Sequence, residues 1–347
     1  MIMKIALLIV VLMSSFNNLV GQISPQFDDM WVIQRDISDE FNEEKLDNDK
    51  WIKPPYNWGG DGHYYYFRME NVKVENGELL LIADTANSNR PFYYSGGIQS
   101  KSNDYSFGYY ELKAILPAYE KNGKQCGKGF WPCFWTYYQE RDGNCIVEHD
   151  EIDILEPCGH QFEDASTNVV GWHDIDSTDC PNTMKLDEYK FTHDSPLSLD
   201  YHLFGAEWLP DRIIFYFDNE PIYYCDCSHK FHHLMNMRNQ YVVIDLQLDG
   251  RYNNTFYPEA SNGFPYSMHV DYFRYYKLRT KPGQSLRVND YLSFMRIMDV
   301  YDSITISNVV MNNSGKKILR ANGIVIENDF EVPIGAELFI IPTPCVE

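Results

Sequence analysis

The sequence predicts an all-β protein built as a sandwich of antiparallel sheets, and three observations lead to that prediction. Between residues 31 and 277, short extended runs are separated by turn signals about every ten residues. No long stretch has helical periodicity. Aromatic residues make up 15% of the chain, with 26 tyrosines and 7 tryptophans, and such residues favour strands.

Two hairpins and one alternating strand follow from the local sequence. The segment NVKVENGELLLIAD has an Asn76-Gly77 turn between extended arms, and RIIFYFDNEPIYY turns at Asp218 to Glu220. In the strand expected at residues 109–114, side chains should alternate between a buried and an exposed face. These two faces carry Tyr110, Leu112 and Ala114 on one side, and Tyr109, Glu111 and Lys113 on the other.

The chain is expected to have three parts. Residues 1–21 place Lys4 ahead of an apolar run and end in small residues, which predicts a signal peptide with cleavage near Gln22. The alternative, a membrane anchor, would need about 20 apolar residues. Residues 22–279 form the expected main domain, and we expect a secreted (extracellular or periplasmic) monomer with no membrane span.

Residues 280–347 are expected to form a small β module. The stretch RTKPGQSLRVND is typical of a linker, and short β segments then alternate with turns at Asn322-Gly323 and Pro333-Ile334-Gly335. A packing appendage is the favoured role, because no aromatic platform is visible. A carbohydrate-binding or sorting module is the alternative.

Charge and cysteine content exclude several classes of protein. The formal net charge is −21 and the 29 basic residues are scattered, so nucleic acid is not an expected partner. Eight cysteines, an even number, are compatible with disulfides in an oxidising compartment. Cys225 and Cys227 lack the spacing of a zinc ribbon, so no metal site is predicted.

The run EHDEIDILEP, residues 148–157, is the chemical centre of the sequence. In a strand, Glu151 and Asp153 share a face, whereas strict alternation places Glu156 on the opposite face. A single β-bulge at Ile154-Leu155 would return Glu156 to the first face, and bulges are enriched near active sites. We therefore expect three carboxylates in one row.

Such a row suits glycoside hydrolysis. In that reaction one carboxylate attacks the sugar while a carboxylic acid protonates the leaving oxygen. Neighbouring acids repel one another, and this repulsion favours keeping one of them protonated. Two alternatives are compatible with the same pattern. The acids could face solvent on an exposed sheet, or they could form a calcium site, although a loop suits calcium better.

EIDILE resembles the catalytic signature of glycoside hydrolase family 16, in its bulged form. GGIQSKSNDYSFGYYELKAILPA and GFWPCFWTYY resemble the family's segments upstream of the signature, and YHLFGAEWLPDRIIFYFDNEPIYY and MHVDYFRYYK resemble those downstream. The resemblance covers about residues 31 to 277. It implies a β-jelly-roll sandwich, concanavalin-like, with a cleft across its concave face.

Carried over by position, the resemblance implies that Glu151 is the nucleophile, Glu156 the general acid and then base, and Asp153 the residue that tunes their protonation. No cofactor is required by this chemistry, and a structural calcium ion is compatible with it. Five further residues are candidates for substrate binding: Trp131, Trp135, Trp58, His173 and Gln247. Trp131 and Trp135 could instead lie buried between the sheets, and Gln247 departs from the Asn that is common in the family.

The expected activity is that of a retaining endo-β-glycosidase acting on a polysaccharide. The bulged signature resembles laminarinases and marine galactanases, so β-1,3-glucan is the favoured substrate, and a β-galactan (agar, porphyran or carrageenan) is the alternative. A sulfated polymer would need basic residues in the cleft, and Lys101, Lys124 and Lys128 are the nearest. A competing class is a lectin-like binder without catalysis, which would be expected to have lost one of the three acids.

Overall fold

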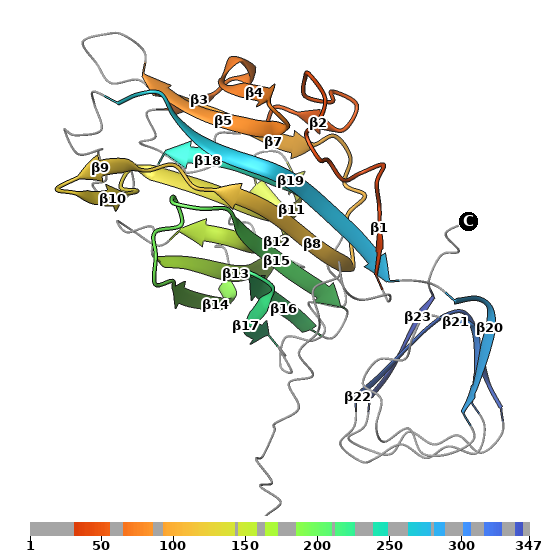
Figure 1. Ribbon diagram of the computed structural model, residues 1–347. Coiled ribbons are helices and arrows are strands. Elements are labelled where there is room, and N and C mark those ends of the chain that lie inside the picture. The colour runs from red at the N-terminus through yellow and green to blue at the C-terminus, as the bar shows by residue number, and fades with distance from the viewer. Residues whose placement is uncertain are drawn as a thin grey trace, which may run out of the picture.

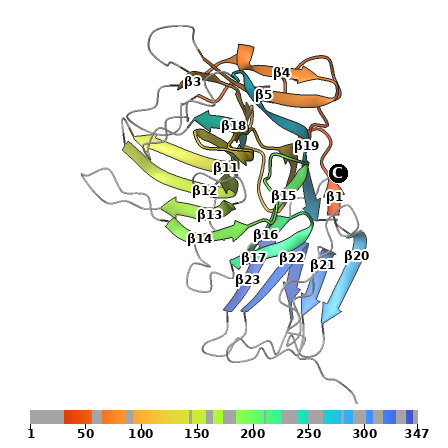
Figure 2. The same ribbon diagram turned by 60° about the vertical axis from the view of Figure 1, so that its left-hand side comes forward.

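The computed structural model describes thirteen segments of the chain, and the structural findings concern these segments alone. They are residues 31–55, 65–85, 93–142, 145–157, 164–172, 185–209, 212–225, 239–248, 263–278, 281–288, 301–306, 316–327 and 337–342. The predicted signal peptide lies outside them. Two large, almost entirely antiparallel sheets form the layers of a sandwich, as the sequence predicts (Figures 1 and 2).

The first layer is a ten-stranded sheet. Its main path runs in the order β17 (Glu220–Cys225), β16 (Arg212–Phe217), β15 (His202–Leu209), β8 (Gly108–Ile115), β19 (Tyr266–Leu278), β5 (Glu78–Thr85), β6 (Tyr93–Ser95) and β3 (Tyr65–Phe67). Beside this path, β1 (Trp31–Ile33) pairs with β19 and β4 (Val72–Glu75) pairs with β5. The β3–β6 pair is parallel.

The second layer is a seven-stranded antiparallel sheet and carries the acids. Its order is β14 (Lys185–Thr192), β13 (Asp164–Trp172), β12 (Cys145–Pro157), β11 (Phe130–Asp142), β18 (Tyr241–Leu248), β7 (Gly97–Ser100) and β2 (Trp51–Ile52). A small hairpin of β9 (Tyr119–Lys121) and β10 (Lys124–Cys126) and a 3-10 turn, η2 (Met69–Asn71), complete the sandwich. No helix of the described residues is long and apolar enough to span a membrane.

The core lies between the two sheets and is built from alternate residues of each strand. On β18, Val242, Ile244 and Leu246 are fully buried in it. On β8, Leu112 and Ala114 come from the facing layer. Because side chains alternate, the residues between these on β18 lie on the opposite face of the seven-stranded sheet.

Both predicted hairpin turns are confirmed. Asn76 and Gly77 have φ of 56° and 81°, and Glu75 pairs with Glu78. The turn between β16 and β17 likewise has positive φ at Asp218 and Asn219. Two consecutive residues with positive φ are typical of the two-residue turns whose twist matches that of the flanking strands.

The expectation that β8 exposes one face is wrong. Tyr109 and Glu111 are 2% and 0% exposed, although they point away from the core. Tyr109 packs with Trp31, Tyr216 and Tyr276 in a second aromatic cluster outside the ten-stranded sheet. Large rings from neighbouring strands therefore cover this face, and alternation in one strand could not reveal that cover.

The chain beyond the sandwich differs from the prediction of a linker followed by short β segments with turns between them. Strand β20 (Lys281–Val288) occupies most of the predicted linker, and β21 (Tyr301–Ile306), β22 (Lys316–Ile326) and β23 (Glu337–Pro342) follow in a sheet of sequence order. All its pairs are parallel (blue in Figure 1). β22 runs straight through Asn322-Gly323, so that predicted turn is wrong, while Pro333-Ile334-Gly335 lies outside the described residues.

Candidate active site

A β-bulge in β12 sets the geometry of the three acids. Against β11, Trp135 pairs with Asp153 and the preceding residue, Phe134, pairs with Leu155. Against β13, the register shifts between Asp153 and Glu156 in the same way. One extra residue of β12 is therefore absorbed on both sides, so the bulge expected at Ile154-Leu155 is confirmed.

The bulge sorts the acids and the apolar residues onto opposite faces. Ile152, Ile154 and Leu155 are buried in the core between the sheets. Glu151, Asp153 and Glu156 are partly exposed on the other face. We call this face of the seven-stranded sheet the acid face.

Glu151 is held by a neighbour on its own strand. His149 lies two residues earlier, so it shares the acid face, and its Nε2 is 3.0 Å from Glu151 Oε2. The imidazole is 6% exposed and the Glu151 side chain 21%. Gln139 of β11 approaches the other ring nitrogen, Nδ1, at 3.4 Å. Sequence reasoning missed His149, although its spacing from Glu151 could have revealed it.

Glu156 is held by the neighbouring strand β13. Asn168 donates a hydrogen bond from Nδ2 to Glu156 Oε2, and Ser166 Oγ donates to the backbone oxygen of Glu156 at 3.0 Å. Both donors are 1% exposed. Asn168 pairs with Asp153 in the ladder, so its amide bridges the two sides of the bulge. Nothing in the local sequence signals this contact, because it depends on the register between two strands.

Aromatic side chains of β11 flank the acids. Trp135 and Tyr137 stack with ring centroids 5.1 Å apart, and they pair with Asp153 and Glu151 respectively. Trp131 lies four residues before Trp135 and packs against the same cluster. Both tryptophans thus lie on the acid face and not between the sheets. Trp135 is 5% exposed, whereas Trp131 is only partly buried.

Gln247 also lies on the acid face, beside Trp131 in the β11–β18 ladder. It is 3% exposed, and its Nε2 is 3.4 and 3.3 Å from the two carboxylate oxygens of Asp245. Burial raises the pKa of Asp245 well above its usual range, although hydrogen bonds from Gln247 and Trp135 oppose the shift. Sequence reasoning missed Asp245. Two other candidates, Trp58 and His173, lie outside the described residues.

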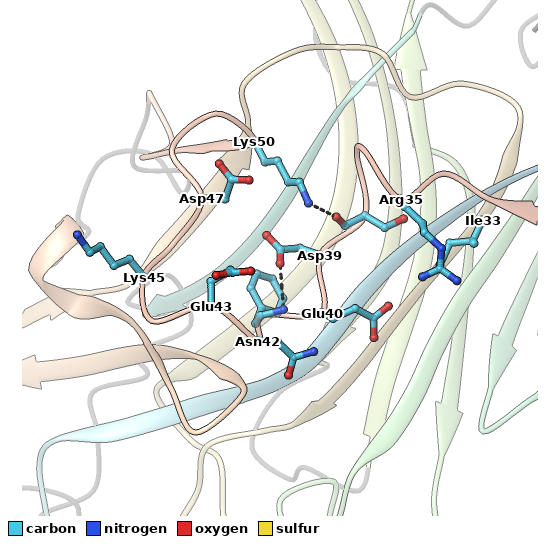
Figure 3. Close-up of a pocket in the computed structure, with 11 residues that line it drawn as sticks. Ile33, Arg35, Asp39, Glu40, Asn42, Glu43, Lys45, Asp47 and Lys50 are labelled. Carbon is cyan, nitrogen blue, oxygen red and sulfur yellow. Dashed lines mark hydrogen bonds between the residues drawn. The ribbon is translucent and has the colours of Figure 1, made fainter. Parts of the chain in front are cut away.

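A separate pocket is lined by residues between 33 and 50 (Figure 3). Within it, Lys50 Nζ donates to the backbone oxygen of Ser38 at 2.6 Å, and the backbone N–H of Phe41 donates to Asp39 at 2.9 Å. Asp39 forms a bridge with Phe273 of β19, which belongs to the ten-stranded sheet. None of the residues that line the pocket belongs to β11, β12, β13 or β18, so the pocket is not part of the acid site.

Comparison with known proteins gives one family. The model of the β-porphyranase A–D glycoside hydrolase family 16 domain matches residues 31–278. The κ-carrageenase of Pseudoalteromonas carrageenovora is 27% identical over 276 residues, which are 70% of this chain and 64% of that protein. Glucan endo-1,3-β-glucosidase A1 of Niallia circulans is 25% identical, over 69% of this chain and 37% of that protein. The chain thus spans less than two thirds of either relative.

Solved structures share the fold. The laminarinase catalytic domain of Thermotoga maritima has a TM-score of 0.56 and 22% identity, covering 72% of this chain and 99% of that one. A κ-carrageenase of Zobellia galactanivorans has a TM-score of 0.57 and 23% identity, covering 75% and 99%. Fold and site together define a jelly-roll domain of the glycoside hydrolase class. The chain belongs to glycoside hydrolase family 16, through the β-porphyranase A–D domain that it matches over residues 31–278.

Proposed function

We propose that this chain is a retaining endo-β-glycosidase with Glu151 as nucleophile and Glu156 as general acid and then base. The observation that carries the proposal is the bulge, which places both carboxylates on one face of β12 with Asp153 between them. A retaining mechanism needs two carboxyl groups close together at the scissile bond. Without the bulge, Glu156 would point into the core.

The first step forms a covalent intermediate. Glu151 attacks the anomeric carbon while Glu156 gives its proton to the departing glycosidic oxygen. His149 engages Oε2 of Glu151, so Oε1 is the oxygen that attacks the sugar. Asn168 likewise engages Oε2 of Glu156, so Oε1 is the oxygen that carries the proton.

The second step releases the sugar. Glu156, now ionised, takes a proton from a water molecule, and the water oxygen attacks the anomeric carbon. The bond to Glu151 breaks and both carboxyl groups return to their starting states. Asp153, between the two, supplies negative charge that favours the protonated form of Glu156 at the start of the cycle.

The subsite proposals rest on the acid face. Trp131 is the more accessible indole, so it is the better candidate for stacking on a sugar ring, whereas Trp135 forms a wall beside Asp153. Gln247 contributes a polar edge next to Trp131. Trp58 and His173 remain candidates from the sequence alone.

A β-galactan is the first candidate substrate. The matched family model is named for β-porphyranases and spans the whole sandwich, and this supports the galactan alternative ahead of β-1,3-glucan. β-1,3-Glucan is the second candidate, because none of the acid-face residues named for the site is a lysine or arginine that could pair with sulfate. Reducing-end assays on porphyran, agarose, κ-carrageenan, laminarin and lichenan distinguish the two. Binding without cleavage of any of them would instead support the lectin-like class.

The mechanism is tested by chemical rescue. In Glu151→Gly, azide should occupy the space of the lost carboxylate and release a glycosyl azide of inverted configuration, detected by NMR. Glu140→Gly, which removes an exposed acid from β11, is the matched control and should keep normal hydrolysis. An inverted product from the unmodified enzyme would refute the assignment.

Export is a further part of the proposal. Residues 1–21 have the order of a signal peptide, so the mature chain should begin near Gln22 and act outside the cytoplasm as a monomer. Mass spectrometry of the protein recovered from culture medium or periplasm measures the mature N-terminus. An uncleaved chain retained in the cell would contradict this.

A further inference from the structure

Three possible metal ligands from consecutive elements of the chain meet at the edge of the sandwich. His193 follows the end of β14, His202 begins β15, and Asp218 lies in the turn between β16 and β17. One ligand atom from each lies within 4.8 Å of the other two. Among the described residues, this is the one such group of three. Cysteine spacing, which was the basis for predicting no metal site, does not bear on this group.

The surrounding contacts orient each ligand. His193 Nδ1 is 2.9 Å from the backbone oxygen of Ser195, and the backbone nitrogen of Ser195 lies 3.3 Å from the same ring nitrogen. With the ring proton on Nδ1, directed at the shorter contact, Nε2 is available to a metal ion. Asp218 Oδ1 accepts the backbone N–H of Leu203 at 2.8 Å, while its Oδ2 lies 2.8 Å from His202 Nδ1. The contacts with Ser195 and Leu203 are of the outer kind that metal-binding imidazoles and carboxylates usually have, whereas the His202–Asp218 contact joins two of the possible ligands.

Ring packing keeps the two histidines in place. Phe217 lies 5.2 Å from His202 in a stacked arrangement and 5.0 Å from His193 edge-on. The two imidazoles are 5.0 Å apart. The His202 side chain is 9% exposed and the Asp218 side chain 41%, so the group is anchored on its inner side and open to water on its outer side.

We propose that His193, His202 and Asp218 bind one Zn²⁺ ion. Two imidazole nitrogens and one carboxylate oxygen form a ligand set that zinc prefers, with water completing a tetrahedron, whereas calcium and magnesium prefer oxygen ligands alone. Tetrahedral coordination with zinc-to-ligand distances of about 2.0–2.2 Å places the ligand atoms about 3.3–3.6 Å apart. A separation as large as 4.8 Å must therefore close by about 1.2–1.5 Å, while the 2.8 Å between His202 Nδ1 and Asp218 Oδ2 must widen by about 0.5–0.8 Å. Rotation of the Asp218 side chain supplies part of this movement. The metal replaces the hydrogen bond between His202 Nδ1 and Asp218 Oδ2, and the ring proton of His202 then lies on Nε2.

The ion would join the two layers of the sandwich at one edge. β14 is the edge strand of the seven-stranded sheet and β17 that of the ten-stranded sheet. Tyr189 of β14 and Tyr223 of β17 stack with centroids 4.8 Å apart and planes inclined by 3°, so the two edges already meet there. Phe217, which packs on both histidines, belongs to the core between the sheets, so the group lies on the opposite side of the seven-stranded sheet from the acid face. Its role is to hold the edges together. It does not depend on the proposed glycosidase activity.

Metal binding is measured on the full chain after treatment with a chelator. Titration with Zn²⁺ by calorimetry should give one site per chain, and Co²⁺ should give the visible absorption of tetrahedral coordination. His193→Gln removes one ligand but keeps the His202–Asp218 contact, and it should weaken zinc binding about 100-fold or more. Asp218→Asn should also weaken it, while Asn still accepts the Leu203 N–H and tolerates the positive φ of 47°.

His269→Gln is the matched control. His269 is a partly exposed histidine paired with Glu78 at 2.9 Å, outside the proposed site, so this variant should bind zinc as the unmodified chain does. Thermal unfolding with and without Zn²⁺ gives a second readout, and zinc should raise the Tm of the unmodified chain and of His269→Gln but not of His193→Gln. Unchanged affinity in both His193→Gln and Asp218→Asn, or no bound zinc in the unmodified chain, would overturn the proposal.

Discussion

Asn168 of β13 donates a hydrogen bond to the carboxylate of Glu156, although its partner across the ladder is Asp153. The bulge makes this diagonal contact available, because it draws Glu156 back toward the position opposite Ser166. The amide thus fixes one oxygen of the proposed acid and base. A shift of the β12–β13 register would remove the contact, even with the same residues in both strands.

Replacing Asn168 should slow the step that needs leaving-group protonation. For Asn168→Ala we expect kcat/KM on the polysaccharide to fall roughly 10-fold, from a lost hydrogen bond of about 1–1.5 kcal/mol. On an aryl glycoside with a good leaving group the fall should be smaller, because less protonation is needed. Ser166→Ala, which loses only a bond to the Glu156 backbone, is the control. Equal losses on both substrates would argue against a positioning role.

The His149–Glu151 contact gives a second kinetic prediction. His149→Asn removes a donor 3.0 Å from the proposed nucleophile, so kcat should fall about 10- to 100-fold, the range expected for a hydrogen bond to a charged group. Gln139→Ala, which removes the contact with the other ring nitrogen and a hydrogen bond from Arg141, should have a much smaller effect. Steady-state rates and circular dichroism together separate lost chemistry from lost folding. If the two variants behave alike, His149 does not position the nucleophile.

The bulge can be tested by changing the length of β12. Deleting Ile154 restores strict alternation and keeps both glutamates on the acid face, so hydrolysis should remain measurable despite a stability loss of about 2–4 kcal/mol from the missing buried side chain. Inserting one alanine after Ile154 lengthens the strand by roughly 3 Å and moves the second glutamate away from the first. The insertion should be inactive. Activity in the insertion variant and none in the deletion variant would contradict the proposed spacing.

Asp245 should make the fold less stable as pH rises. Because burial raises its pKa, the folded state holds a proton at pH values where the unfolded chain, with a pKa near 3.8, has released it. The free energy of unfolding therefore decreases, through this group, as pH increases above 3.8. Asp245→Asn removes that dependence, so its stability relative to the unmodified chain should improve as pH is raised from about 4 to about 7. Urea unfolding at a series of pH values measures the free energy of unfolding of both proteins. If the two free energies changed with pH in parallel, the prediction would be refuted.

Local sequence accounts for the hairpins and much of the acid site. Asn76-Gly77 and Asp218-Asn219 adopt the positive φ values that such turns need, since few other residue pairs tolerate them. The row of acids was predictable for a similar reason, because strand alternation and one bulge follow from the spacing of Ile154, Leu155 and Glu156. His149 follows the same alternation.

Tertiary structure decided what local sequence left open. Trp131 and Trp135 belong to a strand with apolar residues on both faces, so only the pairing with β12 and β18 placed them on the acid face. The cover over Tyr109 comes from other strands. The Asn322-Gly323 signal was overruled when β22 paired in parallel with β21 and β23.

The chain itself therefore determined the fold class, the hairpin turns and the face on which the three acids stand. The structure alone decided the Asn168 contact, the burial of Asp245 and the meeting of His193, His202 and Asp218. The physical reason is the distance along the chain between the residues that interact. Backbone conformation and side-chain alternation depend on neighbours in sequence, whereas register and burial depend on which distant strands pair and what then covers them.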